Sequence, residues 1–149
     1  GLAAALILGA SAQAAEFTVE MLNKDSAGRV MQFEPAFLKV MPGDVVHFVA
    51  TDKGHDSEAI EDGIPEDAEG WKGKLSQNVD VTFETEGLYA YKCTPHFPLG
   101  MVGLIQVGDN PSNVDEIKEL KLPGKAKQRM DELLAEQAGG GKATSAAAQ

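Results

Sequence analysis

Cysteine is scarce in this chain, and its scarcity limits the available chemistry. Cys93 is the one cysteine in 149 residues, so no internal disulfide can form and no metal centre can be built on two cysteines. A chain of this length suits a single domain whose core needs neither disulfides nor a structural metal. The lone thiol therefore requires another explanation.

Positive charge is also in short supply. The chain has 13 basic and 23 acidic side chains, for a formal net charge of −10. This balance gives no electrostatic basis for binding nucleic acid or an anionic membrane surface. Residues 51–70 are especially acidic, and we interpret them as a solvated acidic loop.

Long hydrophobic runs are absent as well, which argues against insertion into a membrane. The apolar stretch GLAAALILGASAQA at residues 1–14 is too short to span a bilayer and ends in the small-x-small pattern of a signal cleavage site. We interpret residues 1–14 as the remnant of a secretory signal peptide. The alternative, an apolar first helix, is disfavoured because Gly9 and the small residues after it pack poorly.

Strand patterns dominate residues 15–109. Phe17, Val19 and Met21 alternate with polar residues, as in a half-buried strand. Residues 33–52 and residues 79–93 each contain two short apolar runs around a turn signal, which we interpret as two hairpins. A last apolar strand, GMVGLIQVG, covers residues 100–108. The spacing of the turns predicts a mainly β protein with a sandwich architecture.

Residues 110–137 change to helical spacing. The apolar side chains recur on two faces, first Val114, Ile117 and Leu120, and then Met130, Leu133 and Leu134. Because Pro123 and Gly124 separate the two groups, we predict a helical hairpin packed on the sandwich within the same domain. Residues 138–149 have neither periodicity nor bulky side chains and predict a disordered tail.

The cysteine lies in the stretch KCTPHFPLGM at residues 92–101, with the spacing C-x2-H-x4-M. The thiolate, imidazole and thioether of Cys93, His96 and Met101 form a donor set that favours copper over magnesium or calcium. His55, in KGHDSE, follows another strand and supplies a second imidazole if that strand end lies beside the loop. Two histidines and a cysteine with a weak axial methionine are the arrangement of blue-copper electron-transfer sites.

Other interpretations use the same residues. Taken singly, each donor is more often a structural residue, and only the combined spacing favours a metal site. An enzyme could use Cys93 as nucleophile with His96 or His55 as base, but Met101 then has no role. A copper carrier or buffer could use the same donors without redox cycling. His47, inside the strand VVHFV, has no glycine-flanked loop to expose it, and we predict that it is structural.

These residues resemble the cupredoxin family of small blue copper proteins, and most closely its pseudoazurins. The resemblance covers residues 16–137 and is carried by CTPHFPLGM, KGH, FEPAFLKVMPGD, AIEDGIPEDAEGWK and the two helices. It implies an eight-stranded Greek-key β-sandwich with two C-terminal α-helices and one type 1 copper ion. It further implies His55, Cys93 and His96 as equatorial ligands, Met101 as axial ligand, and Met31 packed near His96.

Asp56 departs from the family pattern, in which an asparagine generally follows the first ligand histidine and ties the two ligand loops together. A carboxylate can accept hydrogen bonds there but cannot donate them. Its negative charge near a copper thiolate would favour Cu(II) and lower the reduction potential.

The resemblance also implies a function without bond-making: an electron carrier and not an enzyme. It implies a soluble, monomeric, periplasmic protein that moves single electrons from a donor such as a c-type cytochrome to a reductase such as a periplasmic nitrite or nitrous oxide reductase. Its docking surface would be an apolar patch around the edge of His96, rimmed by lysines that orient an acidic partner. The patch consists of Pro95, Phe97, Pro98 and Leu99, and the rim of Lys53, Lys72, Lys74 and Lys92, with Lys24 as a further member.

Overall fold

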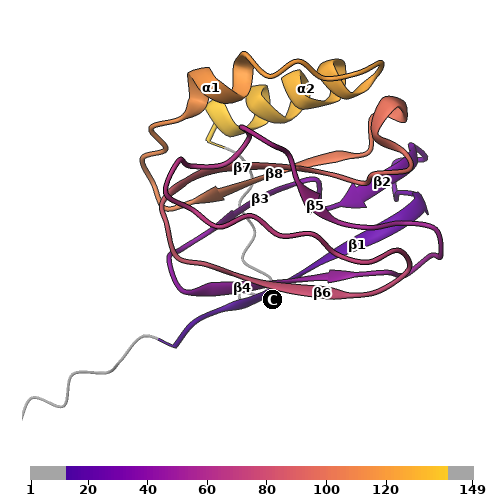
Figure 1. The fold of residues 1–149 in the computed structure, drawn as a ribbon, viewed down its shortest axis with the longest axis horizontal. Coiled ribbons are helices and arrows are strands. Elements are labelled where there is room, and N and C mark those ends of the chain that lie inside the picture. Colours follow the sequence, from indigo (N-terminus) through magenta and orange to yellow (C-terminus); the bar gives the residue numbers. More distant parts are fainter. Residues whose placement is uncertain (1–12, 141–149) are drawn as a thin grey trace, which may run out of the picture.

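The computed structural model describes residues 13–140, which form two four-stranded sheets and two C-terminal helices (Figure 1). The first sheet, called the outer sheet, has the order β2(Val30–Glu34), β1(Glu16–Lys24), β4(Asp44–Val49) and β6(Val79–Phe83). The second, called the inner sheet, has the order β3(Phe37–Val40), β8(Val102–Val107), β7(Gly87–Lys92) and β5(Glu58–Ala59). The predicted eight-stranded sandwich is therefore confirmed. The interpretation of residues 1–12 as part of a signal peptide and of residues 141–149 as tail lies outside the described residues.

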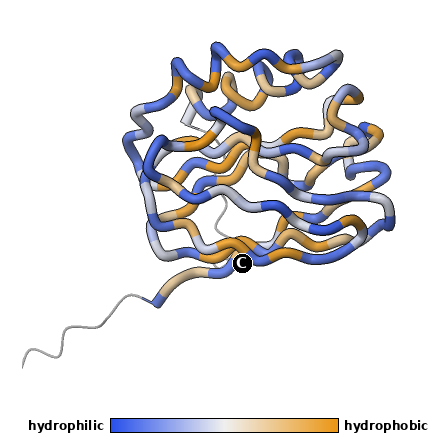
Figure 2. Tube along the Cα trace, in the orientation of Figure 1, coloured by the Kyte–Doolittle hydropathy of each residue, from blue (hydrophilic) through white to orange (hydrophobic). Residues whose placement is uncertain are grey.

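The two sheets differ in how many of their faces are covered. Buried and half-buried residues alternate strictly along β4, so its outer face meets solvent. Every residue of β8 is buried. Figure 1 shows the reason: the helices lie on one face of the inner sheet and the outer sheet lies on the other. Hydrophobic segments follow the strands, and the connecting loops are mostly hydrophilic (Figure 2).

The core between the sheets contains a cluster of aromatic side chains. The rings of Phe33 and Phe48 meet Tyr91 edge-on, with centroid distances of 4.7 and 5.0 Å. Tyr91 lies directly over Gly103 on the next strand, where a Cβ would come within 2.0 Å of the tyrosine ring. Only glycine at position 103 leaves room for this ring, and Cys93 and Met101 belong to the same buried cluster.

The helices α1(Val114–Lys118) and α2(Ala126–Ala138) confirm the predicted helical spacing. Ile117 of α1 and three apolar residues of α2, Met130, Leu133 and Leu134, are buried and form a second core against the inner sheet. At roughly 1.5–3 kcal/mol for each large apolar side chain removed from water, this packing holds α2 on the sheet. Neither helix has the length and apolar character needed to cross a bilayer within residues 13–140.

Both predicted hairpins are wrong. The strands β3 and β4 flank the Pro42-Gly43-Asp44 turn but belong to different sheets, and so do β6 and β7 on either side of Glu86. β3 instead pairs in parallel with β8, and β4 pairs in parallel with β1. A tight turn changes the direction of the chain whether the next strand pairs with the last or crosses to the facing sheet, so the turn signal alone does not distinguish the two.

Asp44 explains how the turn between β3 and β4 is fixed. Its buried carboxylate accepts backbone hydrogen bonds from Ala15 and Met41, each at 2.8 Å. These bonds tie the start of β1 to the turn and compensate the carboxylate for its burial.

Candidate metal centre

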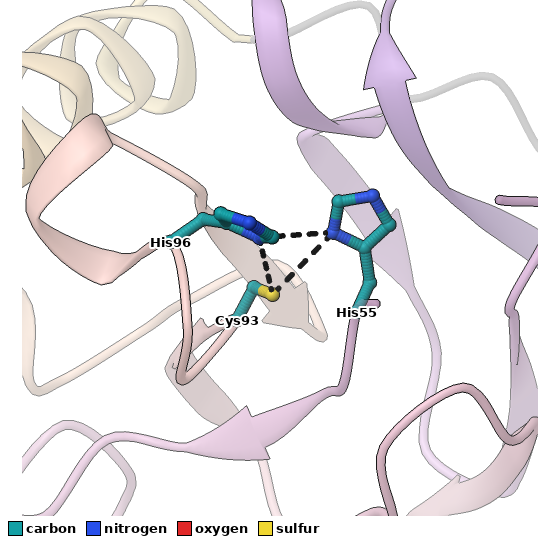
Figure 3. Close-up of side chains that lie close together, drawn as sticks. All are labelled: His55, Cys93 and His96. Atoms are coloured by element: carbon teal, nitrogen blue, oxygen red, sulfur yellow. Dashed lines mark hydrogen bonds between the residues drawn. The ribbon is translucent and has the colours of Figure 1, made fainter. Parts of the chain in front are cut away.

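Three side chains from two loops converge at one end of the sandwich. His55 Nδ1 lies 3.1 Å from His96 Nδ1, and Cys93 Sγ lies 3.7 and 3.5 Å from these two nitrogens (Figure 3). Their potential ligand atoms all fall within 4.8 Å of one another. Within residues 13–140 no other group of three or more His, Cys, Asp or Glu side chains has this arrangement.

Cys93 and His96 are held by the loop that joins β7 to β8. The Cys93 amide donates to the carbonyl of Met101 at 3.0 Å, and the amides of His96 and Met101 donate to the carbonyls of Cys93 and His96, each at 3.2 Å. The short 3-10 helix η1(Phe97–Leu99) continues the turn, and Gly100 ends it in the left-handed region with φ 93°. The loop therefore folds back on itself and returns Met101 beside Cys93.

His55 follows β4 and is fully buried. Its Nε2–H donates to Oδ1 of Asn23 at 2.8 Å, which leaves a lone pair on Nδ1 facing Cys93 and His96. Burial lowers the pKa of His55 below its ordinary value, with a smaller contribution from His96. The neutral imidazole is the form that binds a metal ion.

The protonation of the buried Cys93 thiol shows whether this site suits a metal ion. Burial raises its pKa to about 11, so the thiol stays protonated at neutral pH unless a cation compensates the thiolate. A bound metal ion supplies that compensation and releases the proton. One buried thiol sulfur and two imidazole nitrogens, with a buried methionine in the same core cluster, are the donor chemistry that suits copper.

Asp56 connects the two ligand loops. Its Oδ1 accepts a hydrogen bond from the backbone amide of Thr94 at 2.5 Å. The hydroxyl of Thr94 donates in turn to Oε2 of Glu58 at 2.9 Å. The residue after Cys93 is thus fixed by two carboxylates from the segment that follows His55, and Asp56 makes the tie expected of an asparagine at this position.

Comparisons with known proteins agree with this chemistry. A family model for copper binding proteins of the plastocyanin/azurin family matches residues 19–108. The chain is 52% identical to a pseudoazurin from Paracoccus pantotrophus over 90% of this chain and 92% of the relative. The chain belongs to the pseudoazurins of the plastocyanin/azurin family. Solved pseudoazurin structures are also similar, one from Sinorhizobium with a TM-score of 0.82 at 49% identity, covering 85% of this chain and 98% of that one. Another, from Hyphomicrobium denitrificans, has a TM-score of 0.79 at 50% identity and covers 82% of this chain and 98% of that one.

Membership in the pseudoazurins establishes the cofactor and the type of activity. The chain is a blue copper electron carrier that takes one type 1 copper, and it is not an enzyme. The enzyme interpretation based on a Cys93 nucleophile is therefore excluded.

His96, at the centre of the predicted docking surface, is half-buried, whereas His55 is fully buried. Phe97 is half-buried, and the other three predicted patch residues, Pro95, Pro98 and Leu99, are exposed. Of the predicted lysines, Lys24, Lys53, Lys72 and Lys74 are exposed. Lys92 is half-buried, with its Nζ 4.9 Å from the centre of the Phe97 ring.

The two predicted methionines belong to the core cluster that contains Cys93 or pack against it. Met101 is fully buried in the cluster that contains Cys93, and Met31 is half-buried against the same cluster, with its backbone at φ 53°. Packing of Met31 against His96 stays a prediction. His47 lies on the outer sheet, away from the three converging donors, as predicted for a structural histidine.

Sequence analysis missed three residues that orient the donors: Asn23, Glu58 and Thr94. Asn23 ends a strand that is remote in sequence from His55, and Glu58 belongs to the acidic run that we interpreted as a solvated loop. Only Thr94 carried a local signal, because it lies inside the C-x2-H spacing.

Proposed function

We propose that this chain is a periplasmic, monomeric carrier that passes single electrons from a donor such as a c-type cytochrome to a reductase such as a periplasmic nitrite or nitrous oxide reductase. His55, Cys93 and His96 are the equatorial copper ligands in this proposal, and Met101 is the axial one. The observation that carries it is the convergence of the three donors in a site where only His96 reaches towards solvent.

Copper, when bound, supplies the one-electron change between Cu(II) and Cu(I). The protein contributes a fixed donor set and the exclusion of water. Asn23 orients His55, and the loop hydrogen bonds hold Cys93 and Met101 together, so little reorganisation accompanies a change of charge. His96 lies among apolar residues at the surface, and its ring edge is the route by which an electron leaves.

The predicted lysine rim supports a brief encounter with an acidic partner. Four exposed lysines and Lys92 are the predicted rim, although the formal net charge of the whole chain is −10. Such an asymmetry orients a partner during approach, and a small docking patch allows rapid release. Export to the periplasm is supported by the signal-like residues 1–14.

A copper titration tests the ligand assignment. The protein spanning residues 15–149 is titrated with Cu(II), reduced with ascorbate and reoxidised, while visible and EPR spectra are recorded. We expect an intense thiolate charge-transfer band that saturates at one copper and bleaches reversibly. A thiol that merely oxidises, without such a band, would contradict the assignment of Cys93 as a copper ligand.

Reduction of a partner tests the docking surface. Lys72→Glu and Lys92→Glu should slow electron transfer to an acidic reductase mainly at low salt, because added salt screens surface charges. Lys39→Glu is the control, since Lys39 pairs with Asp109 at the other end of the sandwich. Equal slowing at every ionic strength would indicate a lost contact and contradict electrostatic steering.

A further inference from the structure

The start of α2 is connected to the copper-ligand loop at two places that the proposed electron transfer does not use, once directly and once through a side chain of β2. The first is a contact between backbones. The Lys125 amide donates to the carbonyl of Pro98 at 2.9 Å, just before α2 begins. Gly124 makes this approach possible, because its φ of 54° is left-handed and a Cβ there would lie 2.5 Å from the Pro98 oxygen.

The second contact is a polar bridge through Gln32 of β2, whose side chain is buried. Arg129 of α2 donates from Nε to Gln32 Oε1 at 3.0 Å. Gln32 Nε2 donates to the carbonyl of Gly100 at 3.4 Å, a long hydrogen bond, and to that of Val30 at 3.3 Å. Without Arg129 the buried oxygen of Gln32 would lose its partner, so the bridge depends on the helix.

Both contacts end at backbone carbonyls shortly before Met101, those of Pro98 and Gly100. Pro98 and Gly100 belong to the turn that returns Met101 to Cys93, and Gly100 also packs against Lys125, where an added Cβ would lie 3.4 Å from the lysine. The axial ligand of a blue copper site is weak and long, so the position of its backbone decides how close the sulfur comes to the metal. Contacts to ligand-bearing loops tune such sites.

We infer that Gly124, Lys125, Arg129 and Gln32 form a clamp by which α2 positions the ligand loop, and through it Met101, against the copper. These are positioning residues, since none of them offers a donor to the metal. The inference rests on the proposed assignment of Met101 as the axial ligand. It makes the C-terminal helices part of the machinery that sets the copper spectrum and reduction potential.

The clamp is separable from the packing that holds α2 on the sheet. Met130, Leu133 and Leu134 bury the helix against the inner sheet and make no part of the clamp. We therefore expect substitutions in the clamp to leave a folded protein, in which the position of the loop can be measured on its own.

The first experiment compares two glycines with left-handed backbones. Gly124→Ala forces the loop away from α2, whereas Gly43→Ala, at φ 95° in the turn between β3 and β4, meets nothing within 4 Å. In Gly124→Ala we expect the Met101 amide to exchange with solvent roughly tenfold faster, as for the loss of one hydrogen bond. We also expect changes in the intensity ratio of the charge-transfer bands and in the EPR spectrum. Gly43→Ala should change neither. Equal effects in both variants, or no effect in either, would overturn the clamp.

The second experiment removes the polar bridge. Arg129→Met breaks the contact with Gln32, and the control Glu132→Gln removes only the partner that Arg129 Nη1 meets at 2.9 Å. Arg129→Met should speed exchange of the Met101 amide and shift the copper spectrum, and the control should leave both unchanged. If Arg129→Met lowers stability while both readouts stay as in the unmodified protein, its role is structural only and the clamp is wrong.

Met101→Leu separates failure of the clamp from failure of the ligand assignment, because leucine offers no donor atom to a metal. If Met101 is the axial ligand, Met101→Leu changes the spectrum, and Arg129→Met adds no further change in that background. A full additional change would mean that Arg129 does not act through Met101. If Met101→Leu leaves the spectrum unchanged, the ligand assignment fails, and amide exchange in Arg129→Met still decides whether α2 positions the loop.

Discussion

His47 and His55 carry the same side chain in two regions of the molecule, and their surroundings shift their pKa values in opposite directions. Burial in the loop after β4 lowers the pKa of His55, and Oδ1 of Asn23 accepts a hydrogen bond from its Nε2–H. On the outer sheet, the hydrogen bond to Asp80 raises the pKa of His47 above its ordinary value, and Glu16 adds to the effect. One environment keeps a nitrogen lone pair free for a metal, and the other engages both ring nitrogens with carboxylates. The partners of an imidazole therefore decide its role more than its place in the chain does.

The largest expected effect is on the visible copper band, which should depend on the metal centre and not on the surroundings of His47. Cys93→Ser should abolish the intense visible band of the copper-loaded protein, because the band requires a thiolate bound to copper. His47→Asn should leave the band and the copper stoichiometry unchanged. Visible titration of both variants checks this, and loss of the band in His47→Asn would mean that the two regions are not independent.

The next effect contrasts two carboxylates, one in each region. Asp56→Asn should raise the reduction potential by roughly 60 mV, which corresponds to tenfold in a one-electron equilibrium, because it removes a negative charge from the copper loop. The hydrogen bond from Thr94 can be kept, since an asparagine oxygen also accepts it. Asp80→Asn, beside His47, is the control and should leave the potential unchanged. Protein-film voltammetry measures both, and an unchanged potential in Asp56→Asn would show that the carboxylate charge is compensated.

The sequence predicted the metal centre better than it predicted the strand pairing. Cys93, His96 and Met101 lie in one short loop, so their spacing alone brings three donors together. The addition of His55 required a sandwich in which the end of β4 reaches that loop, and the structure brings it there. Pairing of β3 with β8 links residues on either side of the acidic segment, and no local pattern encodes a partner at that separation.

The orienting residues illustrate a second limit. Asn23 and Glu58 work through single hydrogen bonds across the fold, to His55 and to Thr94. Either residue looks like an ordinary surface side chain in the sequence, because a lone polar residue at a strand end has many possible roles. Such positions become recognisable only when the backbone places them beside their partners.

Two tyrosines of the core also have the same side chain in different surroundings, and their hydroxyl groups differ in hydrogen bonding. Tyr89 donates its hydroxyl to the carbonyl of Thr85 at 2.6 Å, whereas the buried hydroxyl of Tyr91 has no hydrogen-bond partner within residues 13–140. Tyr91→Phe should therefore raise the free energy of unfolding by about 1 kcal/mol, and Tyr89→Phe should lower it by about as much. Urea denaturation of the two variants measures the difference. Destabilisation of both by equal amounts would show that the Tyr91 hydroxyl is satisfied after all.

The smallest effect lies on the outer sheet and depends on pH. Protonated His47 donates to Asp80 at 2.7 Å and to Glu16 at 3.2 Å, so it joins β4 to both of its neighbouring strands. Because its folded-state pKa is raised, this stabilisation is complete below the ordinary histidine pKa of about 6.5 and is lost as pH rises through the folded value. His47 is half-buried but both carboxylates are largely exposed, so the effect should stay below about 1 kcal/mol. Urea denaturation from about pH 5.5 to about pH 8.5 should therefore give a higher free energy of unfolding for the unmodified protein than for His47→Gln, and this difference should shrink with increasing pH. If the difference in the free energy of unfolding is constant across this range, His47 contributes through packing and not through its charge. The contrast with the pKa shift of His55 would then have no effect on stability.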